Sequence, residues 1–121
     1  MVGDSAGGNL AAALTVKAIK SSCPPPSGLV LAYPALSLVP WKFTPSFLLS
    51  LDDQILPHMF LKLCIKAYLN EGPHCSPEKD PLLSPGLVSD EILREFPPTR
   101  ILVGTKDPLH DDSIRFTDRL K

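Results

Sequence analysis

A serine flanked by glycines stands near the start of the chain, in the stretch Gly3-Asp4-Ser5-Ala6-Gly7-Gly8-Asn9-Leu10. The stretch fits the pattern Gly-x-Ser-x-Gly, in which a strained strand-to-helix turn lifts a serine clear of the surface. The residues two before and two after that serine must be nearly free of side chain, because the flanking backbones close in on each other. The pattern predicts Ser5 as a nucleophile, with Gly3 and Gly7 as the glycines of the turn.

The residues after the serine support this prediction. Most of the roughly fifteen residues that follow Ser5 are strong helix formers, as such a turn requires. The amino end of this helix points backbone N–H groups at the place where negative charge develops in acyl transfer. A plain helix cap built from Gly, Ser and Asn is the alternative. Chymotrypsin-like proteases, whose serine motif is similar, are excluded because no helix follows their serine.

Composition excludes several other classes of protein. The chain has 121 residues, 44% of them apolar and 21% charged, and a net charge of −1. A net charge so close to zero does not indicate a basic surface that would bind nucleic acid or an acidic membrane. No apolar run approaches the length of a transmembrane segment. We expect a small globular domain whose 14 prolines lie in irregular connections.

The three cysteines, Cys23, Cys64 and Cys75, form no CxxC motif and have no histidine at metal-binding spacing. We expect free thiols, no metal site, and a reducing compartment, the cytoplasm.

The pattern along the chain alternates helices with apolar strands, which is typical of an α/β fold with a doubly wound, mostly parallel sheet. Apolar runs at 29–33 and 100–104 predict parallel strands buried on both faces. Predicted helices lie between and around these strands, at 6–21, 47–51, 57–69, 89–96 and 114–121.

The sequence gives more specific expectations for three segments. In the irregular stretch 34–45, Trp41 and Phe43 are expected to pack against the core, with substrate contact as the alternative. The helix at 57–69 is expected to face the core, or else to act as a lid over a lipid pocket. Its predicted packing face consists of Met59, Phe60, Leu63, Cys64, Ala67 and Tyr68. The long loop at 70–85 carries His74 and Cys75, which we expect to be solvated.

A second catalytic position follows the second apolar strand. Asp107 stands beyond the carboxyl end of 100–104, where catalytic groups gather in open α/β sheets. A carboxylate there orients an imidazole, and Ser5 before Asp107 obeys the usual chain order of serine, acid and histidine. Asp111 and Asp112 fit better as acidic residues at a helix start.

No histidine of the chain suits the third position. His110 stands too close in sequence to Asp107 to fold back onto the serine, and His58 and His74 precede the acid. We expect the base to come from beyond Lys121. Only Met1 and Val2 precede the turn, so we expect residues 1–121 to form a single partial domain truncated at both ends.

These motifs, in this order, resemble the hormone-sensitive lipase family of esterases, which has the α/β-hydrolase fold. The carrying residues extend over nearly the whole chain: Gly3 to Leu10, Ala32-Tyr33-Pro34-Ala35, Ser50-Leu51, Leu56-Pro57, Ser84-Pro85 and Asp107 to Ser113. The segments around Pro34-Ala35 and from Leu49 to Pro57 resemble the animal lipase more than the bacterial esterases.

The resemblance implies a lipase or carboxylesterase that uses no cofactor and acts on a small-molecule or lipid ester. It implies Ser5 as nucleophile, the backbone N–H of Ala6 as one oxyanion donor, and Asp107 as the acid. It also implies peripheral association with lipid droplets. The family's upstream His-Gly-Gly motif is absent from the sequence, and 70–85 is too short for the animal lipase's phosphorylated insertion.

Two alternatives to an active esterase stay open. One is a ligand-binding member of the fold that resembles a plant hormone receptor of this family, and the other is an inactive truncated product. We expect the chain by itself to be inactive, because triad members act as a unit.

Overall fold

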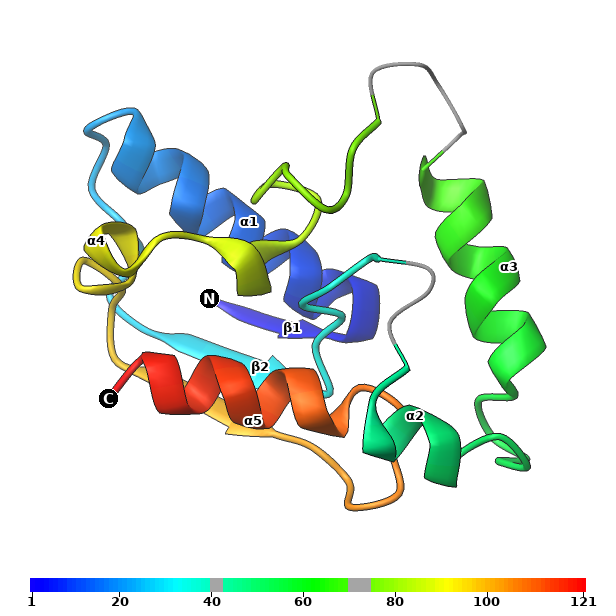
Figure 1. Ribbon diagram of the computed structural model, residues 1–121. Coiled ribbons are helices and arrows are strands. Elements are labelled where there is room, and N and C mark those ends of the chain that lie inside the picture. Colours follow the sequence, from blue (N-terminus) through cyan, green and yellow to red (C-terminus); the bar gives the residue numbers. More distant parts are fainter. Residues whose placement is uncertain (40–42, 70–74) are drawn as a thin grey trace.

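A computed structural model describes residues 1–39, 43–69 and 75–121 of the chain. Within them, a three-stranded sheet has the order β1-β2-β3, and all of its pairs are parallel. The strands are β1 (Val2–Asp4), β2 (Leu29–Ala32) and β3 (Thr99–Leu102). The helices are α1 (Ser5–Lys20), α2 (Pro45–Leu49), α3 (His58–Leu69), the 3-10 turn η1 (Pro85–Leu87), α4 (Asp90–Leu93) and α5 (His110–Arg119). This α/β architecture confirms the predicted fold class (Figure 1).

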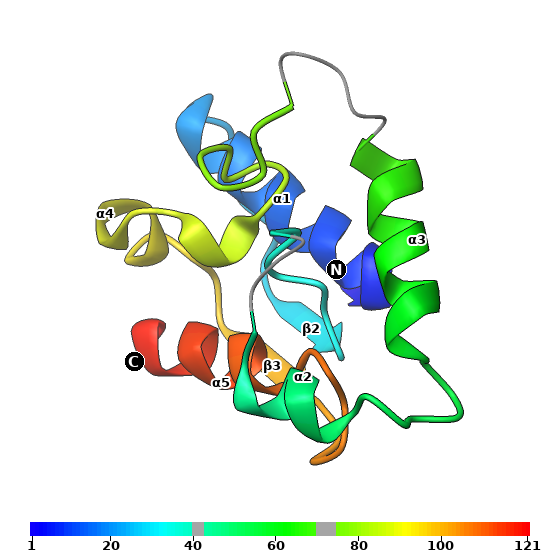
Figure 2. The same ribbon diagram turned by 45° about the vertical axis from the view of Figure 1, so that its right-hand side comes forward.

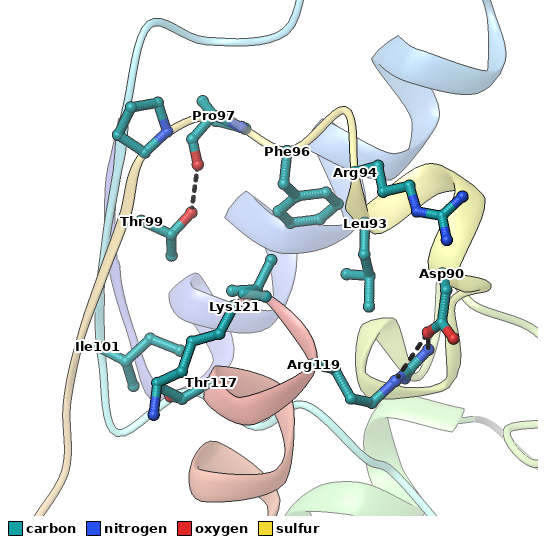
Figure 3. A pocket seen from close by; sticks show the side chains of 12 residues that line it. Asp90, Leu93, Arg94, Phe96, Pro97, Thr99, Ile101, Thr117, Arg119 and Lys121 are labelled. Atoms are coloured by element: carbon teal, nitrogen blue, oxygen red, sulfur yellow. Dashed lines mark hydrogen bonds and ion pairs between the residues drawn. The ribbon is translucent and has the colours of Figure 1, made fainter.

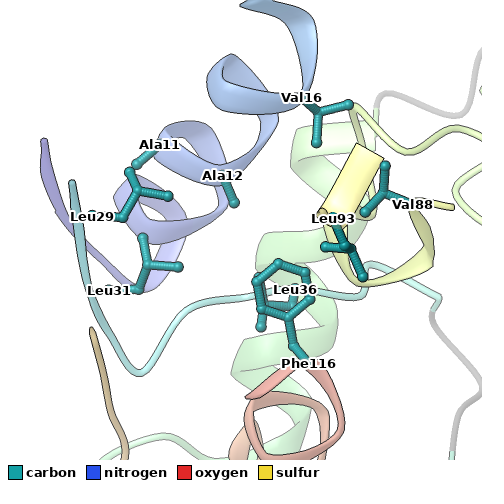
Figure 4. Packing of buried hydrophobic residues seen from close by; sticks show 9 residues of the cluster. All are labelled: Ala11, Ala12, Val16, Leu29, Leu31, Leu36, Val88, Leu93 and Phe116. Carbon is teal, nitrogen blue, oxygen red and sulfur yellow. The ribbon is translucent and has the colours of Figure 1, made fainter. Parts of the chain in front are cut away.

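One face of the sheet carries the main core. Nine buried residues from both ends of the chain form it: Ala11, Ala12, Val16, Leu29, Leu31, Leu36, Val88, Leu93 and Phe116. Figure 4 shows their side chains pointing toward one another between the strands on one side and the helices on the other. Alanines on α1 let this helix approach the sheet closely, and Phe116 of α5 fills the space below.

The opposite face of the sheet is open, so the prediction that both strands are buried on both faces is wrong. Register pairs Gly3 with Leu31 and Ile101 on the helix-covered face, and pairs Asp4 with Ala32 and Leu102 on the other. Leu102 is 58% exposed and Val2 is 76% exposed. Apolar runs alone do not tell a strand covered on one face from one covered on both.

The large apolar residues Leu10 and Leu14 of helix α1 are 55% and 53% exposed. The buried positions of α1 are mostly small: Gly8, Asn9, Ala11, Ala12, Ala13, Thr15 and Val16. Small residues face the sheet because they allow the helix axis to lie close to the strands. The larger leucines therefore turn outward.

The predicted packing face of α3 is also wrong. Met59, Phe60 and Leu63 are more than half exposed, and no residue of α3 is buried. The face that packs is Leu61, Ile65 and Leu69, against a second cluster of Ala35, Leu38 and Leu109. Helix α3 stands beside the carboxyl end of the sheet rather than over its face (Figures 1 and 2).

The irregular stretch after β2 gives a mixed outcome. Phe43 is 68% exposed, so its predicted burial is wrong; its ring makes an edge contact with Phe47 of α2. Trp41, predicted to pack against the core, and His74, predicted to be solvated, lie outside the described residues. Cys75 is half-buried, so the prediction that it is solvated holds only in part.

Candidate active site

Ser5 occupies a strained turn between a strand and a helix. Strand β1 ends at Asp4 and α1 begins at Ser5, whose backbone φ is 47°. A side-chain-bearing residue in the left-handed region costs free energy, and such strain persists where the surrounding structure holds it in place. The predicted nucleophile elbow has this geometry, with Ser5 half-buried at the carboxyl end of β1.

The turn is packed too closely for a side chain at Gly3 and at Gly8, whereas Gly7 has room for one. A Cβ on Gly3 would lie 2.3 Å from the carbonyl oxygen of Gly7, which is a clash with backbone. A Cβ on Gly8 would lie 2.8 Å from the Cβ of Pro34, whereas one on Gly7 meets only Asp4 Oδ1 at 3.6 Å. The prediction that Gly7 must lack a side chain is therefore not supported by the packing.

The start of α1 offers hydrogen-bond donors beside Ser5. The first N–H groups of a helix have no partner within that helix, and Ala6 is the second residue of α1. Asp4, in the N-cap position, makes no side-chain capping bond. The amino end of a 16-residue helix thus lies at the serine, with the partial positive charge of the helix dipole.

Asp107 lies in a turn that follows β3. Its Oδ1 accepts from Leu109 N at 2.8 Å, and its carbonyl oxygen accepts from His110 N at 3.0 Å. The Oγ of Ser46 in α2 donates to the carbonyl oxygen of Pro108 at 3.2 Å. The loop that carries Asp107 is therefore fixed both by its own turn and by a contact from α2.

Ser5 and Asp107 lie at the same edge of the sheet. Both follow the carboxyl ends of parallel strands, β1 and β3, with β2 between them. Strands two places apart are separated by roughly 10 Å, a gap that side chains from both ends can enter. The structure thus brings the two predicted residues to the same edge of the sheet.

The side chains of His58 and His110, the histidines among the described residues, interact with Phe47 and Asp111. His110 Nδ1 lies 3.6 Å from Asp111 Oδ1, and the ring of His58 makes an edge contact with Phe47. Asp111 in turn accepts from the backbone N–H of Ser46 at 2.9 Å through Oδ2. That hydrogen bond is the main reason why the pKa of Asp111 lies below its ordinary value, with smaller contributions from the Ser46 and His110 side chains.

An apolar pocket opens beside Ser5. It has a volume of about 180 Å³ and is lined by Ser5, Ala6, Asn9, Ala35, Leu38, Leu61, Cys64, Ile65 and Tyr68. A larger pocket, about 830 Å³, lies near the amino end of β3, where Thr99, Phe96 and Arg119 contribute to its walls (Figure 3). Because the strands are parallel, that larger pocket is at the edge opposite to Ser5.

Three polar residues for which the sequence predicts no individual role hold the site together. Asn9 is 2% exposed, and its Nδ2 donates to the carbonyl oxygens of Ala35 at 2.7 Å and Leu83 at 2.9 Å. Ser84, fully buried, accepts from Leu38 N at 3.0 Å through its Oγ. Ser46 links α2 to the loop of Asp107, as described above. Thr44-Pro45 before Ser46 is a helix-start signal that was available in the sequence.

Within residues 1–39, 43–69 and 75–121, no group of three or more His, Cys, Asp or Glu side chains is arranged to hold a metal ion. No helix in those ranges is both long and apolar enough to cross a membrane. Cys23, Cys64 and Cys75 form no disulfide in the structure.

Known proteins are similar to this chain in sequence and in fold. A family model for the alpha/beta hydrolase fold matches residues 1–121. Hormone-sensitive lipase from Homo sapiens is 38% identical over 101 residues, which cover 79% of this chain and 9% of that protein. An esterase from Gibberella moniliformis is 29% identical over 122 residues, covering 100% of this chain and 37% of the esterase.

Solved structures agree with the sequence matches. Carboxyl esterase 2 from the fungus Tuber melanosporum has a TM-score of 0.87 and 30% identity over 98% of this chain and 38% of its own. Brefeldin A esterase, a bacterial homologue of human hormone-sensitive lipase, has a TM-score of 0.85 and 31% identity over 98% of this chain and 34% of its own. The chain thus spans between 9% and 38% of the length of these four relatives. It belongs to the α/β-hydrolase family, among hormone-sensitive lipase and its esterase relatives.

Proposed function

We propose that this chain carries the nucleophile and the acid of a carboxylic-ester hydrolase that acts on acylglycerols or related esters. Ser5 is the nucleophile, Asp107 the acid, and the backbone N–H of Ala6 one oxyanion donor. The observation that carries the proposal is the φ of 47° at Ser5, on a strand-to-helix turn at the edge that also holds the Asp107 loop.

The chemistry follows from these positions. Ser5 Oγ attacks the ester carbonyl carbon while its proton passes to an imidazole, and the carbonyl oxygen takes negative charge beside the amino end of α1. The C–O bond to the alcohol then breaks as the imidazolium returns the proton to the leaving alkoxide. Water attacks the acyl-enzyme by the same route and releases the carboxylic acid. Asp107 orients the imidazole and stabilises its charged form.

In this proposal, the base is a histidine that is not among residues 1–121. His110 Nδ1 faces Asp111 Oδ1 at 3.6 Å, and the ring of His58 makes an edge contact with Phe47. The 121-residue chain by itself is therefore expected not to react with a fluorophosphonate probe. The unpaired thiols support a reducing location, the cytoplasm. Association with lipid droplets is proposed only by likeness to hormone-sensitive lipase.

A chimera tests the function. Residues 1–121 replace the matching segment of the Tuber melanosporum esterase, whose backbone superposes with a TM-score of 0.87. The chimera is expected to hydrolyse a p-nitrophenyl ester, and Ser5→Ala is expected to reduce the rate by about 10⁴-fold or more. Ser22→Ala is the matched control, because Ser22 also has a positive φ, 53°, at the other end of α1.

Two results would contradict the proposal. Strong fluorophosphonate labelling of the isolated chain at Ser5 would show that the base lies within it. An active chimera that is unaffected by Ser5→Ala would show that the nucleophile lies elsewhere.

A further inference from the structure

Tyr33 has a strained backbone at the carboxyl end of β2. Its φ is 37°, and among the described residues the other non-glycine residues with a positive φ are Ser5 and Ser22. Ser22 follows the end of α1, where a left-handed residue commonly ends a helix, and Ser5 forms the turn described above. Neither explanation applies to Tyr33, which follows a strand and does not start a helix.

The conformation of Tyr33 is unfavourable for two reasons. A tyrosine carries a Cβ, so the left-handed region costs it free energy that a glycine would not lose. The next residue is Pro34, and a residue before proline favours extended backbone. Strain of this kind persists only where the surrounding structure holds it, and it is concentrated at functional sites.

Backbone hydrogen bonds hold Tyr33 and the residues after it between the two outer strands. On the side of β3, Tyr33 N donates to the carbonyl oxygen of Leu102 at 2.6 Å. On the side of β1, Ala35 N donates to the carbonyl oxygen of Ser5 at 3.2 Å. One residue beyond the last register pair of β1 and β2, Tyr33 stands level with Ser5. The turn at Tyr33 therefore directs the chain back onto the nucleophile.

Two further contacts fix the same segment against the start of α1. Gly8 approaches Pro34 so closely that a Cβ on Gly8 would lie 2.8 Å from the proline Cβ. The Nδ2 of Asn9 donates to the carbonyl oxygen of Ala35 at 2.7 Å. The two residues that follow the strained turn therefore contact the helix that begins at Ser5.

Resting on the proposed function, we propose that Tyr33 is a positioning residue for the nucleophile. Its left-handed backbone turns Pro34 and Ala35 back onto the Ser5 turn and thereby fixes where the serine hydroxyl stands. The left-handed conformation, rather than the phenol group, is the property that matters. Its effect on the reaction is large, because a displacement of the reacting atom by about 1 Å lowers a rate by about 10²-fold.

Substitutions at Tyr33 separate backbone conformation from lost packing. Valine, which is branched at Cβ, strongly disfavours the left-handed region, whereas asparagine and glycine tolerate it. If the side chain mattered only through the apolar surface that it covers, Tyr33→Val would do less harm than Tyr33→Gly. The proposal predicts the opposite order. Ser22→Val is the matched control, because it introduces the same branched side chain at a φ of 53°, at the far end of α1.

In the chimera described above, the expected effect is on kcat for a p-nitrophenyl ester. Tyr33→Val is expected to lower kcat by about 10²-fold with KM little changed, because the displaced nucleophile affects the reacting bond more than binding. Tyr33→Asn, Tyr33→Gly and Ser22→Val are expected to keep most of the wild-type kcat, and circular dichroism checks that each variant is folded. A greater loss for Tyr33→Gly than for Tyr33→Val, or an equal loss for Ser22→Val, would overturn the proposal.

Amide hydrogen exchange followed by NMR tests the same coupling on the 121-residue chain without catalysis. The rate at Ala35, the amide that bonds to the nucleophile turn, is compared with the rate at Leu29, whose N–H donates to the carbonyl oxygen of Pro98 at 2.9 Å. In Tyr33→Val, the ratio of the Ala35 rate to the Leu29 rate is expected to rise about tenfold, because the strain opens the Ala35 bond locally. Ser22→Val is expected to leave this ratio unchanged.

The two experiments separate this inference from the proposed function. An active chimera whose Tyr33→Val variant keeps its kcat refutes the inference and leaves the function intact. A chimera that is inactive with Tyr33 in place contradicts the function, and amide exchange at Ala35 then decides the inference. A raised ratio in Tyr33→Val supports it, and an unchanged ratio refutes it.

Discussion

At the scale of single residues, the turn at Ser5 is held by contacts that leave no room for side chains. The φ of 47° at Ser5 is strained, and the backbone at Gly3 closes onto the carbonyl of Gly7. Asn9, one turn further along α1, ties that helix to the carbonyls of Ala35 and Leu83. The same close packing therefore holds Ser5 in its strained backbone conformation and fixes the residues around it.

Gly3→Ala and Gly7→Ala form a matched pair. An added Cβ meets backbone at 2.3 Å in the first and only Asp4 Oδ1 at 3.6 Å in the second. Gly3→Ala is expected to lower the free energy of unfolding by about 1–3 kcal/mol, as overpacking does. Gly7→Ala is expected to raise it by up to about 1 kcal/mol, because alanine favours the helix. Urea unfolding followed by circular dichroism measures both, and equal destabilisation would contradict the packing argument.

Asn9→Leu keeps the branched shape of the side chain but removes both hydrogen bonds. It leaves two carbonyl oxygens without their donor, so the expected loss of stability is about 2 kcal/mol. Thr15→Val is the control on the same helix: Thr15 is fully buried, but its Oγ1 bonds only to Ala11 O of α1 itself. If thermal unfolding gives the two variants the same midpoint, Asn9 does not hold the segments together.

At the scale of elements, the sequence predicted the positions of the turn at Ser5 and of α1, but not which face of α3 packs against the rest of the molecule. The strand-to-helix turn at Ser5 and helix α1 were predicted to within one residue, because glycine spacing and helix propensity are local. The buried face of α3 was mistaken, because Leu61 and Ile65 pack on Leu38 and Leu109, which come from distant parts of the chain. Asp107 was placed at the correct edge because parallel strands end together. Ser46 was missed as its support, since a contact over 62 residues leaves no trace in the local sequence.

The contact between α2 and α5 is expected to depend on pH. The hydrogen bond from Ser46 N lowers the pKa of Asp111 below its ordinary value of 3.8, so ionised Asp111 stabilises the folded state. This stabilisation is present above pH 3.8 and is lost as pH falls through the lower pKa of the folded state.

The substitution Asp111→Asn is expected to remove the pH-dependent stabilisation that the Asp111 carboxylate provides. The stability difference between wild type and Asp111→Asn, measured by urea unfolding, is expected to shrink as pH is lowered from about 6 to about 3. Asp118→Asn, in an exposed pair with Lys121, is expected to have little effect at any pH. A stability difference for Asp111→Asn that stays constant with pH would contradict the assignment.

At the scale of the whole molecule, one covered and one open sheet face explain the distribution of apolar surface. Helices α1 and α5 share the core on one side (Figure 4). On the other side Val2 and Leu102 are exposed, and β1 and β3 are the outer strands of the described sheet. Apolar edges and faces of this kind favour association between chains.

The isolated chain is therefore expected to self-associate through the open face. Leu102→Lys is expected to shift the molecule toward monomer in sedimentation velocity at equal concentration. Ile114→Lys, on an exposed position of α5 with 44% of its surface accessible, is the control and is expected to change little. If both variants act alike, the surface as a whole, and not this face, governs association.

The central claim is that Ser5 and Asp107 work as one catalytic unit at the carboxyl edge of the sheet. Ester hydrolysis by the chimera, compared among Ser5→Ala, Asp107→Asn and the double variant, tests it most directly. Asp107→Asn is expected to lower kcat by about 10⁴-fold. The double variant is expected to be no slower than Ser5→Ala, since members of a triad act together. If the loss of kcat in the double variant equals the product of the two single losses, or if Asp107→Asn keeps full activity, the claim is contradicted.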